Sequence, residues 1–136
     1  MLQPKRSKYR KTFRPKYYGK VALRGTTLAF GEFGLRSTEA GLISARQIES
    51  ARRAITNFTK RGGRVYIRIF PDVPQTRKPP ETRMGGGKGD ILQYVAPIGI
   101  GRMLFEMGGV DEATARAALR LAQYKLSVKS VFVAKE

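Results

Sequence analysis

The clearest periodic pattern of apolar positions lies between residues 42 and 63 and predicts a helix. Ser44 can cap its start, and Gln47 stands three residues later, which is the spacing of a capping box. Ile43 and Ile48 flank this cap at the spacing of a hydrophobic staple. Apolar residues then recur at intervals of three and four, which places them on one buried face. This stripe comprises Ile48, Ala51, Ile55 and Phe58, and Gly62 and Gly63 are expected to end the helix.

A second helix is expected to begin at Asp111 and Glu112, because their negative charges suit the positive end of the helix dipole. Its apolar positions have the same spacing as those of the first helix. Alternating stretches and stretches rich in β-branched and aromatic residues predict strands. The expected stripe is Ala115, Ala118, Leu119, Ala122 and Leu126, and the expected strands are 64–70, 90–98, 102–108 and 128–134.

Two parts of this pattern leave the local structure less defined. Residues 21–35 predict two short strands or one bent hairpin, with Gly25 as a turn or bulge. The strands 90–98 and 102–108 look like a hairpin closed by the turn "GIG", with Pro97 at an edge or a bulge. The order of elements predicts an α+β fold, a mainly antiparallel sheet with two helices packed on it.

The composition of the chain indicates what kind of partner it binds. The chain has 136 residues, the size of one domain, and 27 Lys and Arg against 10 Asp and Glu give a net charge of +17. Such a charge is best tolerated when a polyanion cancels it, and nucleic acid is favoured over an anionic membrane or no polyanion. Without Cys or His, zinc fingers, disulfides and Cys or His nucleophiles are excluded. We expect no metal, no cofactor, no transmembrane helix and no secretory signal.

Residues 1–20 form a basic extension that lacks both a helical and a strand period, so alone it should be disordered. Aromatic rings alternate with the cations, as suits a segment that binds phosphates and stacks on exposed bases. Some of these rings could dock on the protein's own core instead. The rings are Tyr9, Phe13, Tyr17 and Tyr18, and the cations are Lys5, Arg6, Lys8, Arg10, Lys11, Arg14, Lys16 and Lys20.

The outer side of the first helix forms a second basic surface. Arg46, Arg53 and Lys60 are seven residues apart and share a face, and Arg52 and Arg61 flank it. A charged outer face is normally just solvated. Only Glu49 offsets the charge of these cations. We therefore favour the interpretation that this face is a ridge that contacts RNA phosphates.

The stretch 71–90, "PDVPQTRKPPETRMGGGKGD", shows no periodicity and is expected to be a long loop. It fails the phosphate-binding pattern G-x-x-x-x-G-K-[ST] at both ends, with Thr82 and Gly89. We interpret it as a basic, glycine-tipped finger that inserts into RNA, although a merely solvated loop remains the alternative. Its expected contact residues are Arg77, Lys78, Arg83, Met84, Gly85, Gly86, Gly87 and Lys88. No catalytic constellation appears.

Five separated blocks of the chain are "MLQPKRSKYRK", "FGEFGLR", "ARQIESARRAI", "KRGGRVYIRIFPDVPQTRKPPETRMGGGKG" and "FEMGGV". In this order they resemble the bacterial-type family of large-subunit ribosomal protein L-sixteen. The resemblance implies a hammerhead-type α+β fold on large-subunit rRNA, near the peptidyl-transferase centre and the A-site tRNA, with a role in late subunit assembly. It implies that the glycine-rich loop and the basic extension reach the tRNA side, and it makes Arg83 a candidate for hydroxylation.

The sequence thus predicts a non-enzymatic structural protein of the ribosome, with an extension at 1–20 and one domain at 21–136. The expected partners are large-subunit rRNA, A-site tRNA and neighbouring ribosomal proteins, with no membrane and no homo-oligomer. The expected location is a bacterial ribosome in the cytoplasm or an organellar one. Two alternatives stay open: a free basic RNA-binding factor of assembly or translation, and a phosphate-handling enzyme that uses the glycine-rich loop.

Overall fold

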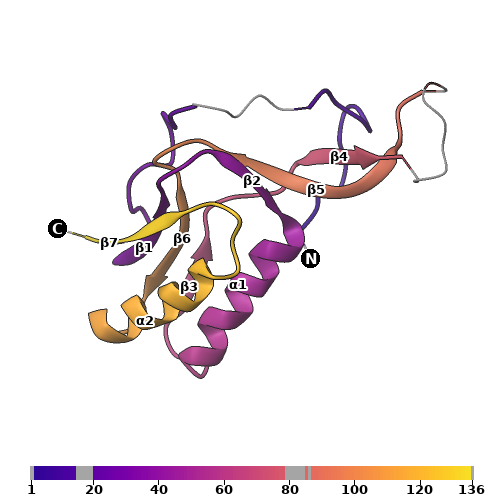
Figure 1. The fold of residues 1–136 in the computed structure, drawn as a ribbon. Coiled ribbons are helices and arrows are strands. Elements are labelled where there is room, and N and C mark those ends of the chain that lie inside the picture. The colour runs from indigo at the N-terminus through magenta and orange to yellow at the C-terminus, as the bar shows by residue number, and fades with distance from the viewer. Residues whose placement is uncertain (1, 15–19, 79–84, 86, 136) are drawn as a thin grey trace.

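The computed structural model describes residues 2–14, 20–78, 85 and 87–135. Its elements are β1 (Phe33–Ser37), β2 (Gly41–Ser44), α1 (Ala45–Phe58), β3 (Arg64–Ile67), β4 (Val73–Arg77), β5 (Asp90–Ile98), β6 (Met103–Gly108), α2 (Glu112–Gln123) and β7 (Ser130–Ala134). The strands form two antiparallel sheets, with the orders β3-β6-β1-β7 and β2-β5-β4. The α+β prediction is therefore confirmed (Figure 1).

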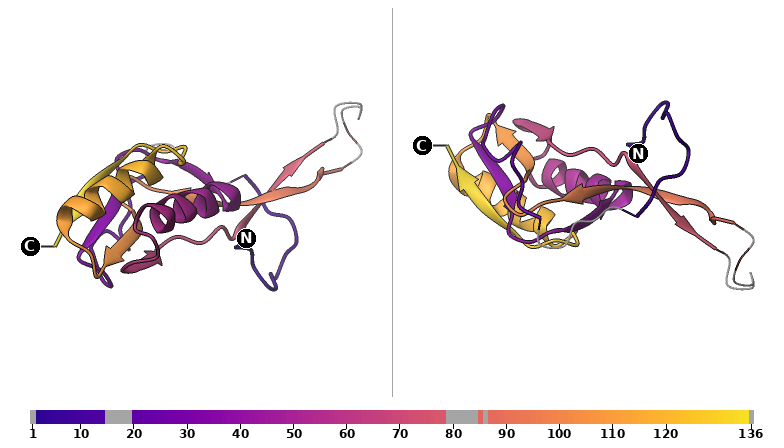
Figure 2. Two further views of the ribbon diagram at one scale, coloured as in Figure 1. Left: turned by 90° about the horizontal axis from the view of Figure 1, so that it is seen from below. Right: turned by 90° about the horizontal axis from the view of Figure 1, so that it is seen from above.

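The core lies between the two helices and the four-stranded sheet. α1 contacts β3 and α2 contacts β1 and β7, so the helices lie side by side against this sheet (Figure 2). α1 also contacts β2 and β5, which ties the second sheet to the same core. Leu35, Phe105 and Met107 meet the helices from the strands and are fully buried. The core thus rests mainly on aliphatic and aromatic burial, the dominant favourable term in folding.

The predicted cap of α1 is confirmed. Ser44 Oγ accepts a hydrogen bond from the Gln47 N–H at 3.2 Å, and Gln47 Oε1 accepts one from the Ser44 N–H at 2.9 Å. The apolar stripe is buried as far as Ile55, but the prediction is wrong for Phe58, which is 44% exposed. Phe58 lines an open groove between the two helices, together with Leu121 and Tyr124 from the end of α2 and the turn after it.

α1 ends earlier than the glycines suggest. The last helical residue is Phe58, and Lys60 and Arg61 then take left-handed backbone angles, with φ of 51° and 65°. This region is unfavourable for residues with a Cβ atom. The turn after α1 is therefore made by two basic residues, and Gly63, with φ of 71°, only completes it.

The expected hairpin between 90–98 and 102–108 is wrong. β5 and β6 form as strands, but they belong to different sheets, so the "GIG" segment is a corner and not a hairpin turn. Ile100 in this corner bonds to the chain at Lys20 and Ala22, and Gly101 has a φ of 92°. These bonds to a distant segment direct the chain away from β5 and into the other sheet.

The strands expected within 21–35 are mostly absent. Val21 makes only an isolated bridge with Ile100, and the regular strand β1 begins at Phe33. The reason lies in the hydrogen bonds of the intervening backbone. The N–H groups of residues 29–31 bind a side-chain carboxylate, that of Glu106, rather than a neighbouring strand.

The stretch 71–90 is not a structureless loop. Residues Val73–Arg77 form β4, which pairs with β5 and extends it into a long two-stranded arm (Figure 1). Pro74 fits there because β4 is an edge strand and can lack one donor. Pro97 also fits, because β5 at that point pairs only with Leu42 of β2, beyond the end of β4.

Ser44→Ala should lower the free energy of unfolding by about 1 kcal/mol, because the first turn of α1 loses a capping acceptor. Chemical denaturation would measure the change. Ser50→Ala, an exposed serine within α1, is the matched control and should change stability little. Equal effects of the two substitutions would show that the capping box contributes nothing measurable.

Candidate RNA interface

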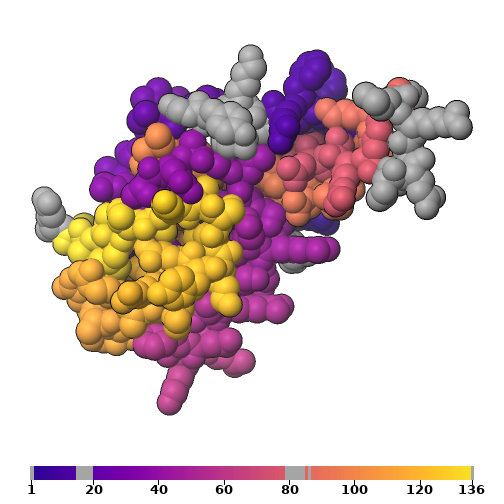
Figure 3. All heavy atoms as spheres, in the orientation of Figure 1, coloured from indigo at the N-terminus to yellow at the C-terminus, as the bar shows by residue number. Residues whose placement is uncertain are grey.

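The β4–β5 arm projects from the body of the molecule, and Gly85 and Gly87 stand near its end (Figures 1, 2 and 3). Within the arm, the side chains of Gln75 and Gln93 form a hydrogen bond of 2.7 Å across the strand pair. At Gly89 the two strands come very close: a Cβ atom there would lie 2.7 Å from the backbone carbonyl carbon of Arg77. Glycine at this position therefore serves the arm itself.

The N-terminal segment lies against this arm. Lys88 Nζ donates a hydrogen bond to the backbone oxygen of Thr12, and Lys11 Nζ donates one of 3.3 Å to the backbone oxygen of Lys88. Lys88 Nζ also lies 5.8 Å from the centre of the Phe13 ring, a cation–π contact. The segment shows no helix or strand in residues 2–14, as expected, yet Leu2 packs against the core.

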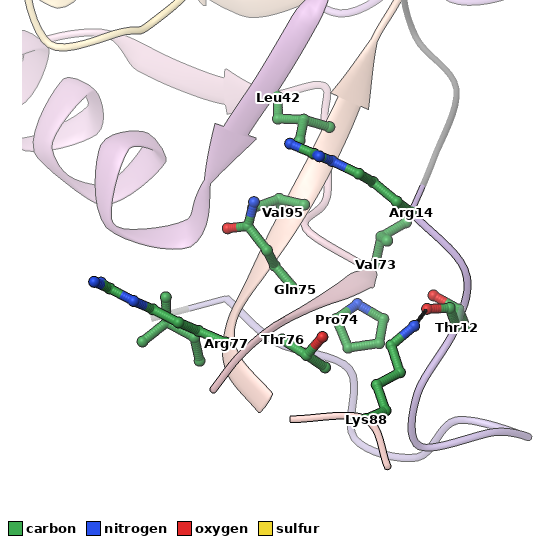
Figure 4. Close-up of a pocket in the computed structure, with 11 residues that line it drawn as sticks. Thr12, Arg14, Leu42, Val73, Pro74, Gln75, Thr76, Arg77, Lys88 and Val95 are labelled. Atoms are coloured by element: carbon green, nitrogen blue, oxygen red, sulfur yellow. Dashed lines mark hydrogen bonds between the residues drawn. The ribbon is translucent and has the colours of Figure 1, made fainter. Parts of the chain in front are cut away.

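Between the segment and the arm lies a groove with basic side chains at its edges (Figure 4). Lys88 points to Thr12 from one side, and Arg14 reaches across the strands toward Leu42. Arg14, Arg77 and Lys88 are all exposed, while the floor is mainly apolar or neutral. The lining residues are Thr12, Arg14, Leu42, Val73, Pro74, Gln75, Thr76, Arg77, Lys88, Leu92 and Val95. The fold thus gathers two predicted contact segments into one basic surface.

Most other predicted contact residues of these two segments are accessible. Lys78 is half-buried, and its Nζ donates a hydrogen bond of 2.7 Å to the backbone oxygen of Gly85. Gly85 and Gly87 have φ of 97° and 95°, a region that favours glycine. Exposed cations of the N-terminal segment are Lys5, Arg6, Lys8, Arg10 and Arg14, and Lys11 is half-buried. Lys16, Arg83, Met84 and Gly86 lie outside the described residues.

The outer face of α1 is a separate basic surface. The 14 residues of α1 span about 21 Å. Lys60 and Arg61 follow the C-terminal end of this helix and therefore lie far from the arm. Glu49 offsets part of the charge, because its carboxylate forms ion pairs with Arg52 and, at 3.3 Å, with Arg53. The bond from Arg52 outweighs burial and lowers the pKa of Glu49. The exposed cations of this face are Arg46, Arg53, Lys60 and Arg61, and Arg52 is half-buried.

Sequence patterns missed a third cluster, centred on Glu106. This side chain is fully buried, and its Oε1 accepts hydrogen bonds from the N–H groups of Ala29, Phe30 and Gly31 at 2.9, 2.9 and 3.0 Å. Its other oxygen forms an ion pair with Arg68. The only sequence signal is a single acid inside the otherwise apolar stretch "MLFEM". An acid there must find partners when it is buried.

Electrostatics keeps this carboxylate ionised. Burial by itself would raise the pKa of Glu106, but hydrogen bonds from Gly31, Arg68, Phe30 and Ala29 outweigh it and hold the pKa below the ordinary value of 4.5. Nearby, Arg102 donates to the backbone oxygens of Arg68 and Arg24. Burial, and then the charge of Arg68, lower the pKa of Arg102.

In the described part of the chain, no helix is long and apolar enough to cross a membrane. Within the same residues, Asp and Glu form no group of three that could hold a metal ion.

The chain is similar to known proteins over nearly its full length. Residues 4–133 match the family described as Ribosomal protein L16p/L10e. The chain belongs to this family. "Large ribosomal subunit protein uL16" of Dehalococcoides mccartyi strain CBDB1 is 57% identical over 136 residues, which cover 100% of this chain and 91% of that protein. The protein of the same description from Rhizobium rhizogenes strain K84 is 59% identical over 133 residues, covering 98% and 96%.

Family membership confirms the resemblance carried by the five sequence blocks. The chain is a ribosomal protein of the large subunit, a structural constituent of the ribosome that acts in translation, and not an enzyme. The two basic surfaces are those expected of a protein whose neighbours in the ribosome include RNA. The glycine-rich end of the arm accordingly belongs to a ribosomal protein, and the enzyme alternative is dismissed.

Glu106→Gln should lower the free energy of unfolding at neutral pH by about 3–5 kcal/mol, because it leaves the guanidinium of Arg68 without its carboxylate. The wild-type protein should lose stability as pH falls below 4.5, because a carboxylate with a lowered pKa favours the folded state only while ionised. Denaturation at several pH values measures both effects.

The stability of the Glu106→Gln variant should depend less on pH below 4.5 than the stability of the wild-type protein. Glu112→Gln removes an exposed acid from α2 and is the matched control, with an expected effect below about 1 kcal/mol. Identical pH profiles of the wild-type protein and the Glu106 variant would contradict the role assigned to this carboxylate.

Lys88→Met should free the N-terminal segment from the arm, because it removes the bond to Thr12 and the contact with Phe13. Cleavage by trypsin after Arg10 and Lys11 should become faster, while the unfolding midpoint should change little. Lys125→Met, at an exposed position after α2, serves as the control. Unchanged cleavage in the Lys88 variant would show that the segment is held by other contacts.

Proposed function

We propose that this protein binds large-subunit rRNA near the peptidyl-transferase centre, helps to position A-site tRNA and acts late in subunit assembly. The observation that supports rRNA binding best is the meeting of the basic N-terminal segment with the basic arm. Lys11, Thr12 and Phe13 contact Lys88, so two segments far apart in sequence present one cationic surface. Such a surface can neutralise several phosphates of a folded RNA at once.

The outer face of α1 supports a second region of rRNA contact. Its exposed cations outnumber the single acid Glu49, and that carboxylate is already shared by Arg52 and Arg53. Lys60 and Arg61 extend the charge beyond the helix. Contacts on two separate surfaces would fix the orientation of the protein on the RNA, since phosphate contacts determine register and orientation.

The arm supports the proposed contact with A-site tRNA. It projects from the body, its paired strands make its base stiff, and glycines with positive φ stand at its end. Exposed N–H groups and a glycine backbone allow close approach to sugar and phosphate. Arg83 and Met84 are proposed as contact residues on the strength of the sequence resemblance, and Arg83 as a site of hydroxylation.

The remaining alternative is a free basic factor of assembly or translation. A stable constituent should sediment with the large subunit of its bacterial or organellar ribosome after a moderate salt wash, whereas a free factor should be released. The proposed partners are rRNA, A-site tRNA and neighbouring ribosomal proteins.

Binding of a large-subunit rRNA transcript should weaken steeply with salt. Each neutralised phosphate should contribute about −0.7 to −0.9 to the slope of log affinity against log salt concentration. Replacing Lys5, Arg6 and Lys8 with Ala should make the slope shallower by about 2 to 3. Replacing Arg120, Lys125 and Lys129 with Ala removes the same charge from the α2 side and should change the slope less. A wild-type affinity independent of salt would contradict the proposal.

Arg83→Ala should weaken A-site tRNA binding to reconstituted large subunits by about 1–3 kcal/mol, because one charge-assisted contact is lost. The variant should still enter subunits through the N-terminal segment and the α1 face. Arg120→Ala, an exposed arginine of α2, is the control. Titration of A-site tRNA measures the difference, and equal affinities of both variants and the wild type would remove the tRNA role.

A further inference from the structure

Phe30 is a large apolar side chain that is 65% exposed, although the backbone around it is firmly held. Its ring stacks on Tyr66, with ring centres 5.5 Å apart and an interplanar angle of 24°. The guanidinium carbon of Arg68 lies 5.3 Å from the centre of the same ring. Phe30 is therefore a supported ring and not a loose side chain at the surface.

Most of the Phe30 side chain is left to solvent, although two neighbours contact its ring. Val65 and Ile67 pack toward the core, and strand residues alternate between the two faces of a sheet. Tyr66 and Arg68 alternate with these two residues and therefore lie on the opposite face of the sheet. Phe30 contacts both of them there. With 65% of the side chain exposed, Tyr66 and Arg68 leave much of the ring accessible to a ligand.

The backbone beneath the ring is fixed by the Glu106 carboxylate. The N–H groups of Ala29, Phe30 and Gly31 all bind Oε1 of this buried side chain. The next N–H, that of Glu32, donates to the backbone oxygen of Met107 at 2.9 Å. A ring held in this way loses little conformational freedom when a ligand stacks on it, which favours binding.

The charges around the ring favour an anionic ligand. Arg68 donates to the backbone oxygen of Thr27, and Arg102 donates to that of Arg24, so two arginine side chains lie against the segment that carries the ring. Arg24 belongs to that segment and is exposed. Of the acids nearby, Glu106 is fully engaged with Arg68 and with N–H groups, whereas Glu32 and Asp72 are exposed. Arg102 has no carboxylate within ion-pair distance among the described residues.

We propose that the exposed ring of Phe30 stacks on an unpaired nucleobase of RNA, while Arg24 and Arg102 attract the adjoining phosphates. Exposed aromatic rings beside cations bind single-stranded nucleic acid in this way, because every base has a flat face. The proposal rests on the proposed RNA-binding function and adds a third surface, over the four-stranded sheet, to the arm and the α1 face. A protein partner would also cover an apolar ring, but the surrounding arginines favour RNA.

The test uses the full-length protein and two RNA probes. One is a single-stranded oligoadenylate of about 12 nucleotides with a central 2-aminopurine, and the other is a duplex of similar length. Phe30→Leu keeps an apolar side chain but removes the aromatic face, and Phe30→Tyr restores it. Phe58→Leu, at the exposed phenylalanine of α1, is the matched control.

Phe30→Leu should bind the single strand about 5- to 150-fold more weakly and should quench 2-aminopurine less. The slope of log affinity against log salt should stay unchanged, because a stacked ring releases no counterions. Phe30→Tyr and Phe58→Leu should both behave as the wild type, and duplex binding should be the same for all variants. The unfolding midpoint should be kept, since the backbone bonds to Glu106 do not involve the ring.

Failure of the two proposals can be told apart. Salt-dependent binding by the wild type together with equal affinities of Phe30→Leu and Phe58→Leu would overturn base stacking and leave RNA binding intact. Absence of wild-type RNA binding would contradict the proposed function itself. If Phe30→Leu binds both probes normally but fails to enter large subunits, the ring contacts a protein neighbour, and base stacking is wrong.

Discussion

The hydrogen bonds and the ion pair of the Glu106 carboxylate hold one side of this molecule together. This carboxylate joins three parts of the chain that are far apart in sequence: the backbone of residues 29–31, the guanidinium of Arg68 and the strand β6 itself. Residues 22–32 contain no helix or strand of their own. A fully buried carboxylate is costly unless all its oxygens are satisfied, and here the satisfaction of that charge is what orders the segment and places Phe30.

The rest of the molecule solves a different problem, that of a strong excess of positive charge. Every core residue packed against the helices is apolar, and the cations stand on the N-terminal segment, the arm and the outer face of α1. Few of them are neutralised within the described part of the chain, where Glu49, Glu106 and Glu112 provide the ion pairs. The isolated protein therefore carries self-repulsion that a polyanion relieves.

Features that depend on neighbouring residues could be predicted from the sequence, and features that depend on distant partners could not. The cap at Ser44 and the buried stripe through Ile55 follow from local spacing. The apolar and aromatic residues of β5 and β6 predict two strands, but neither sequence shows that these strands enter different sheets. For the site, charge and composition indicate which residues are exposed cations. That Thr12 meets Lys88, or that Glu106 holds residues 29–31, depends on contacts over roughly 75 positions, which no local pattern records.

The turn after α1 contains backbone strain that lowers the stability of this protein. Lys60 and Arg61 occupy left-handed backbone positions that glycine would adopt without strain, at a cost of about 1–2 kcal/mol each. A sequence optimised only for folding would place glycine there. Both side chains are exposed cations, so this strained turn presents two positive charges at the end of the helix. At the end of this helix the isolated chain is thus less stable than a turn built from glycine would make it.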